Sequence, residues 1–144
     1  MIRLIRSIFL FTLGGGIYSI LEMMFKLILF QGGVIHWSMF LAGGLVFVEL
    51  ASISDVFPWD MPLLLQGVIG SVIITVTELI FGIYFNIYLG MGIWDYSSLP
   101  FNLCGQICLP FSLLWIALSI VAVLLNGWLS YRLFGKERPH YKLI

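Results

Sequence analysis

The chain has 144 residues, of which 61% are hydrophobic and only 10% charged, and its formal net charge at pH 7 is zero. Its mean hydropathy is +1.09, whereas about a quarter of the residues of a soluble domain are charged. This composition excludes a soluble globular domain, and the lack of a long basic run argues against nucleic acid as a partner.

Four apolar segments are predicted to cross a bilayer, whose hydrocarbon core needs about 20 helical residues. We expect them at residues 5–30, 37–53, 62–89 and 102–129. The second is short for a span, and Pro110 is expected to kink the fourth because its ring removes a backbone hydrogen bond. Residues 1–144 are therefore expected to form a single transmembrane domain, with no room for a separate soluble domain.

Basic residues gather near the two ends of the chain and are almost absent from the predicted loops. They are Arg3, Arg6, Arg132, Lys136, Arg138 and Lys142. By the positive-inside rule both termini lie in the cytoplasm, which agrees with an even number of spans. We therefore predict an all-α, polytopic integral membrane protein: a four-helix transmembrane bundle, multi-pass, in a prokaryotic cytoplasmic membrane.

Glu78 lies in the middle of the apolar run SVIITVTELIFGIYF, residues 71–85. Hydrocarbon does not solvate a carboxylate, so neighbouring helices or trapped water must do so. An ionisable residue at such a depth is a candidate functional residue. Small and polar residues share its helical face and are expected to point into the bundle. They are Gly67, Ser71, Thr75, Gly82 and Asn86.

Glu22 lies at a comparable depth in the first predicted span, because each helical residue rises by about 1.5 Å. Two nearby carboxylates in a low dielectric do not both stay ionised cheaply, so Glu22 and Glu78 would share a proton or a cation. Alternatively, Lys26 neutralises Glu22, since it follows four residues later at the favoured spacing for an ion pair. Both interpretations of Glu22 stand.

Other polar residues fall at the predicted outer ends of the spans. His36 precedes the second span, while Asp95, Asn102 and Gln106 lie at the entrance to the fourth. Together with the two glutamates and Asn86 they predict a polar pocket that opens away from the cytoplasm. We predict that this pocket binds a ligand or shares a proton or ion.

Four strings of the sequence carry a resemblance to a known family. They are GIYSILE (16–22), HWSMFLAGGL (36–45), TELIFGIYFN (77–86) and WDYSSLPFNLCGQICLPFSLLW (94–115). They closely resemble the bacterial CmpB-like family, labelled ABC-transporter type IV, and a group of small eukaryotic transmembrane proteins that share the WDYS motif. The resemblance covers nearly the whole chain and implies a compact multi-span membrane protein. The positions matched by its motifs include Glu22, His36, Glu78, Gly82, Asn86, Trp94, Asp95, Tyr96, Ser97, Asn102, Gly105 and Gln106.

The WDYS motif has two interpretations. Trp94 and Tyr96 suit a membrane interface, and Asp95 and Ser97 can accept hydrogen bonds from free backbone amides. The motif is therefore either a structural plug that closes the outer face or part of a binding site, since caps and anion sites use the same groups. Gly82 and Gly105 are assigned structural roles beside it.

Several kinds of chemistry have no sequence pattern to support them. There is no GxxxxGK[ST] loop, so the chain cannot power ATP-driven transport without a separate ATPase. Cys104 and Cys108 have no second cysteine pair and only two histidines accompany them, so we predict neither a metal nor a cofactor. No Ser, His and Asp grouping announces a hydrolase, and no residue is assigned as catalytic.

We therefore predict a permease-like or binding subunit for a small solute or ion that works in the lipid bilayer. A bundle of four helices has little interior, so we expect a homo-oligomer or a separate membrane or ATPase partner. One alternative is an intramembrane enzyme or lipid-handling protein in which His36 acts with Glu78 or Asp95 as acid and base. The other is a structural or assembly subunit whose polar residues only hold helices together.

Overall fold

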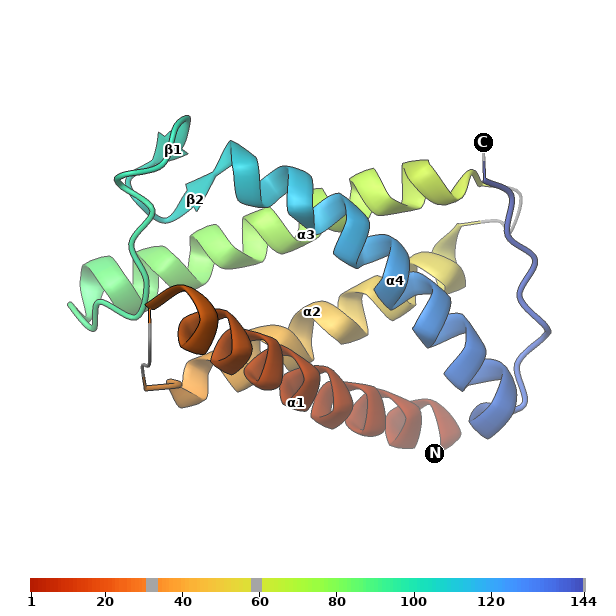
Figure 1. The fold of residues 1–144 in the computed structure, drawn as a ribbon. Helices are drawn as coiled ribbons and strands as arrows, with labels where there is room; N and C mark the ends of the chain where they lie inside the picture. Colours follow the sequence, from red (N-terminus) through yellow and green to blue (C-terminus); the bar gives the residue numbers. More distant parts are fainter. Residues whose placement is uncertain (31–33, 58–60, 144) are drawn as a thin grey trace. The chain divides into compact units, whose positions relative to one another are not determined.

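The computed structural model describes residues 1–30, 34–57 and 61–143. Within these ranges the chain forms the helices α1 (Ile2–Phe30), α2 (Trp37–Val56), α3 (Leu63–Phe81) and α4 (Leu109–Phe134) (Figure 1). A π-helix, η1 (Gly82–Tyr88), continues α3. The strands β1 (Asn102–Leu103) and β2 (Ile107–Cys108) pair antiparallel before α4. The predicted all-helical class is confirmed, with this hairpin as an addition.

Three stretches of helix in the described ranges are long and apolar enough to cross a membrane. They are Ile2–Ile28, Leu63–Tyr88 and Leu109–Phe134, while α2 contributes the shorter apolar stretch Trp37–Ile53. An apolar helix of more than about 20 residues has the length of a bilayer's hydrocarbon core. The fold is therefore that of a membrane protein by length and composition.

The chain divides into two compact units, Met1–Glu49 and Leu50–Ile144. In the first unit, α1 packs against α2 through glycines. A Cβ atom at Gly14 would collide with Phe47, and one at Gly43 would collide with Tyr18. Lipid gives helices no hydrophobic reason to associate, so residues small enough to permit close approach hold such pairs together.

In the second unit, α3 and α4 run antiparallel and side by side (Figure 1). Small and hydroxylated residues again form the contact. Gly70 packs against Ser119, the Thr75 hydroxyl lies 3.1 Å from the Ser112 hydroxyl, and the Ser71 hydroxyl donates to the Ser112 carbonyl. The polar face predicted for residues 62–89 therefore points toward the fourth helix.

The fourth helix begins later than the sequence suggested. Phe101, Cys104 and Gly105 have φ angles of 53°, 52° and 68°, which lie outside the right-handed helical region. The prediction of a helix from residue 102 is therefore wrong for residues 102–108, which form the hairpin. The prediction for Pro110 is also wrong, because Pro110 lies in the first turn of α4, where a missing N–H breaks no helical bond.

The tail, residues 135–143, folds back over the second unit (Figure 1). The Tyr141 hydroxyl donates to the Val123 carbonyl in α4 at 3.2 Å. The N–H of Leu63, at the start of α3, donates to the Lys142 carbonyl at 2.7 Å. The tail thus contacts α4 near Val123 and Gly127 and gives an acceptor to an amide that α3 itself leaves unpaired.

We expect Gly127→Ala to displace the tail, because a Cβ atom at Gly127 would collide with the Tyr141 hydroxyl. Overpacking of this kind should lower the free energy of unfolding by about 1–3 kcal/mol. Adding Tyr141→Phe should restore part of the loss, since the colliding oxygen is then removed. The measurement is unfolding in detergent micelles followed by circular dichroism.

The matched control is Gly16→Ala, where nothing lies within 4 Å of the added carbon. This variant should be at least as stable as the parent chain, because alanine is favoured over glycine inside a helix by about 0.5–1 kcal/mol. Equal stabilities of the Gly127→Ala and Gly16→Ala proteins would show that the tail does not pack on α4.

Candidate functional site

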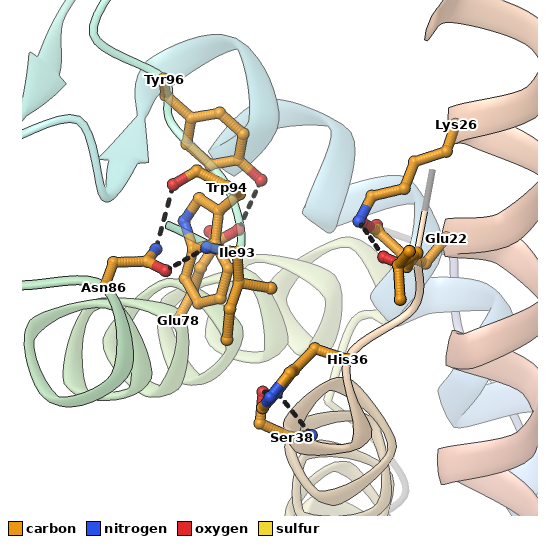
Figure 2. A network of polar contacts seen from close by, with 10 residues as sticks. Glu22, Lys26, His36, Ser38, Glu78, Asn86, Ile93, Trp94 and Tyr96 are labelled. Atoms are coloured by element: carbon orange, nitrogen blue, oxygen red, sulfur yellow. Dashed lines mark hydrogen bonds and ion pairs between the residues drawn. The ribbon is translucent and has the colours of Figure 1, made fainter. Parts of the chain in front are cut away.

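The Glu78 carboxylate is held by two neutral donors from different segments of the second unit. The Tyr96 hydroxyl donates to its Oε1 at 2.9 Å, and the Trp115 indole N–H donates to its Oε2 at 3.2 Å. Tyr96 belongs to the loop that joins η1 to α4, residues 89–108, and Trp115 belongs to α4. Figure 2 shows the Tyr96 hydroxyl directed toward Glu78. One acidic residue therefore connects α3, the 89–108 loop and α4.

Aromatic rings surround these hydrogen bonds. The Tyr96 ring stacks on Phe111 with centroids 4.7 Å apart and planes 19° apart, and Phe111 lies 6.1 Å from Trp115. Trp115 is buried. Rings exclude water and lower the local dielectric, which strengthens the hydrogen bonds to a carboxylate.

The Asn86 side chain holds the start of the 89–108 loop against η1. Its Nδ2 donates to the Trp94 carbonyl at 3.0 Å, and its Oδ1 accepts the Ile93 N–H at 2.6 Å (Figure 2). The same Nδ2 also donates to Gln106 Oε1 at 2.8 Å. A primary amide offers two donor hydrogens and an acceptor oxygen, and all of these are used here. Asn86 therefore connects the end of η1 to the loop through hydrogen bonds.

Gln106 forms a second set of hydrogen bonds within the loop, and its side chain is almost fully buried. Its Nε2 donates to the Cys104 carbonyl at 2.9 Å, and its own carbonyl accepts the Trp94 indole N–H at 3.0 Å. A Cβ atom at Gly82 would come within 2.6 Å of Gln106 Oε1. Gly82 is therefore needed because it leaves room for this side chain.

Asp95 and Asn102 shape the rest of the loop. Asp95 Oδ1 accepts the Ser97 N–H at 2.8 Å, and Asn102 donates to the Leu99 carbonyl at 2.8 Å. Asn102 Oδ1 accepts the Gly105 N–H at 3.1 Å. Gly105 has a positive φ, and a Cβ atom there would come within 2.6 Å of Asp95 Oδ1, so the position requires glycine twice over.

The hydrogen bonds from the backbone N–H of Ser97, and then from its side chain, lower the pKa of Asp95 below its ordinary value of 3.8. Donors that bind the charged form favour ionisation of a carboxylic acid. Asp95 is exposed, so its effect is on the shape of the turn.

The two predicted site residues of the first unit have local partners. Lys26 Nζ lies 3.2 Å from Glu22 Oε1 and also donates to the Val34 carbonyl at 3.0 Å (Figure 2). The Glu22–Lys26 ion pair foreseen as an alternative is thus present, and a ligand-binding role for Glu22 stays a prediction. His36 Nδ1 lies 2.8 Å from the Ser38 hydroxyl and accepts the Ser38 N–H at 3.3 Å, which places it as a cap of α2.

The second unit therefore brings together most of the predicted residues, but in three groups. Glu78 and Tyr96 meet directly, whereas Asn86, Trp94 and Gln106 form a neighbouring network. Asp95, Ser97, Asn102 and Gly105 lie farther along the loop and bond to its own backbone. The sequence reasoning missed Trp115, although a tryptophan buried in a span needs an acceptor for its N–H.

Metal binding has no support in the geometry. Among the residues that the structure describes, no three His, Cys, Asp or Glu side chains are grouped to hold an ion. Cys104 is exposed and Cys108 is buried, and both are free thiols.

Comparison with known proteins gives one positive result. The family model described as "Putative ABC-transporter type IV" matches residues 3–136. No curated protein and no solved structure was found to match the chain.

We expect Asn86→Leu to loosen the 89–108 loop, because the Ile93 N–H, the Trp94 carbonyl and the Gln106 side chain each lose a partner. Each buried polar group left unpaired costs about 1–3 kcal/mol. Hydrogen exchange of loop peptides in micelles, followed by mass spectrometry, should become faster. Ser98→Ala is the control, since Ser98 is an exposed residue of the same loop. Equal exchange in the two variants would contradict the role given to Asn86.

The Asp95 turn should be sensitive to acid. Because folding lowers the pKa of Asp95, its contribution to stability is complete above the ordinary value of 3.8 and is lost as the pH falls through the lower folded value. Near-ultraviolet circular dichroism of the loop aromatics should therefore change on acidification below that point. In Asp95→Asn, which keeps the acceptor oxygen but does not titrate, the part of this change due to Asp95 should vanish. Superimposable titrations of the two proteins would contradict the assignment.

Proposed function

Because the chain belongs to the family described as "Putative ABC-transporter type IV", we propose that it is a permease-like or binding membrane subunit for a small solute or ion. The observation that supports this most is the Glu78 carboxylate, which receives hydrogen bonds from Tyr96 and Trp115 inside a long apolar helix. Acidic residues at such positions are rare and usually mark an ion or solute pathway.

The proposed membrane placement has four crossings, by α1, α2, α3 with η1, and α4. The 20 residues of α2 extend about 30 Å, which equals the thickness of the hydrocarbon core. The basic residues near both ends of the chain support the proposal that the two termini lie in the cytoplasm of a prokaryotic cell. Glu78, 15 residues after the start of α3, then lies about 22 Å along its helix, in the outer half of the membrane.

The donors to Glu78 suit a group that exchanges a proton or cation. A phenol and an indole orient the carboxylate and stabilise its negative charge without contributing a positive charge of their own. Arrival of a proton or a small cation therefore changes the local charge while the surrounding rings stay in place. Glu78 is the proposed coordinating or proton-sharing group, and Glu22 is proposed as a second one.

We propose that the energy and the partners for transport come from other chains. The sequence contains no phosphate-binding loop, so a separate ATPase subunit is the proposed source of energy for active movement. Two pairs of closely packed helices leave little interior for a pore. We therefore also propose a homo-oligomer or a complex with another membrane subunit.

A structural or assembly subunit is the second candidate, favoured by the bonding of the 89–108 loop. Asn102 and Gln106 were predicted to lie at the outer entrance of the pocket and Asn86 to bind a ligand or ion, yet the hydrogen bonds cited for them go to groups of the loop itself. Those residues thus serve the structural plug, and their ligand-binding role remains a proposal. The enzyme alternative has no comparable observation, since His36 bonds to Ser38 at the start of α2.

Glu78→Gln should abolish or strongly reduce movement of the ion that the site serves. The purified chain in phosphatidylcholine vesicles is assayed for proton flux with a trapped pH-sensitive dye and for sodium flux with a trapped indicator. The matched control is Glu137→Gln, the same chemical change at an exposed residue of the tail. It should leave the flux unchanged.

Flux that is equal in the two variants removes the coordinating role from Glu78. If the Glu78→Gln protein in addition no longer retains a membrane subunit that co-purifies with the parent chain, the assembly function replaces the permease function.

A further inference from the structure

In the 89–108 loop, amide side chains are turned inward while two apolar side chains of the hairpin are exposed. The amides of Asn86, Asn102 and Gln106 are turned toward the backbone of the loop. The side chains of Phe101 and Leu103, in contrast, are 81% and 52% exposed. A loop in water has the opposite arrangement, whereas a segment in contact with lipid must satisfy its backbone internally.

The backbone of Phe101 has a strained conformation. Its φ of 53° is a conformation that bulky residues rarely adopt, and Cys104 in the same hairpin has a φ of 52°. Such conformations are strained and persist where the surrounding structure requires them. The outward position of Phe101 is therefore held by the fold of the hairpin.

The hairpin continues the apolar surface of α4. Leu109 and Leu113, in the first turns of that helix, are exposed. A shallow, mostly apolar groove of about 290 Å³ joins the two elements. Its lining consists of Phe101, Leu103, Ile107, Cys108, Leu109 and Ser112. A single surface thus runs from the spanning helix onto the hairpin.

Exposed aromatic residues indicate how deep the hairpin lies in the membrane. Trp128 is exposed toward the far end of α4, and the 19 helical rises from Leu109 to Trp128 extend about 29 Å, one hydrocarbon thickness. Exposed tryptophan and tyrosine mark the two interfaces of a membrane. The stacked, exposed rings of Tyr84 and Tyr88 lie in η1, immediately before the loop. The hairpin therefore lies at the level of the opposite interface.

We infer that the β1–β2 hairpin is inserted into the outer leaflet, where Phe101 and Leu103 contact lipid acyl chains and a chain occupies the groove. This inference rests on the placement of α3 and α4 across the membrane given in the proposed function. It is independent of whether Glu78 binds an ion. Contact with lipid gives these two side chains apolar surroundings, which are more favourable for them than water.

The test compares single-cysteine variants labelled with bimane in phosphatidylcholine vesicles. In a Cys104→Ser/Cys108→Ala background, the label is placed at Phe101→Cys on the hairpin or at the exposed Ser98→Cys in the same loop. A third label at the exposed mid-helix position Val121→Cys reports on the spanning helix. Quenching by brominated acyl chains and by aqueous iodide is measured for each. Because residues 98 and 101 share one loop, both lie on the same side of the membrane.

We expect the label at residue 101 to be quenched by brominated lipid and to respond to iodide several-fold less than the label at residue 98. Leu103→Cys should repeat the result if Phe101→Cys disturbs the fold. Iodide quenching at 101 and 103 as strong as at 98, with lipid quenching intact at 121, overturns the inference and leaves the membrane placement standing. Protection of 101 and 103 from both quenchers also overturns it, because protein then covers the hairpin. Loss of lipid quenching at 121 overturns the placement of α4, and the inference with it.

Discussion

A carboxylate in a long apolar helix finds its hydrogen-bond donors within the protein, and this constraint organises the second unit. Glu78 takes its donors from Tyr96 in the 89–108 loop and from Trp115 in α4. The loop must therefore return over the end of α3, and α4 must pack beside α3 with its indole facing inward. The same contacts that solvate the acid also fix the three segments to one another.

The sequence predicted those parts of this arrangement that a polar residue in an apolar segment reveals, and missed those that depend on an apolar residue or on backbone conformation. Glu78 was identified because an acid in an apolar run is conspicuous, and Asn86 because it shares the helical face of Glu78. Trp115 was missed because a tryptophan in a span looks like any other apolar residue until its acceptor is known. The helix from residue 102 was wrong because apolar periodicity cannot reveal the positive φ of Phe101 and Cys104, and only Gly105 hinted at it.

Residues predicted to lie at the opening of the polar pocket make hydrogen bonds to the loop in the structure. Asn102 and Gln106 were chosen as lining residues because polar side chains at the end of a span suggest access for a solute. Their amides instead replace the water that would otherwise satisfy the backbone of the loop. Polar side chains in such a loop can thus serve the fold itself, and Glu78 differs because side chains of the loop and of α4 donate to it within a long apolar helix.

One hydrogen bond described above has a topological consequence. The Leu63 N–H and the Lys142 carbonyl are joined, and the ion pair between Lys136 and Asp55 lies in the same unit. Everything between residues 63 and 142 therefore forms a closed ring whose two ends touch. A short peptide linker could join those ends covalently, so this part of the chain is suited to circular permutation, with new termini opened elsewhere in the ring.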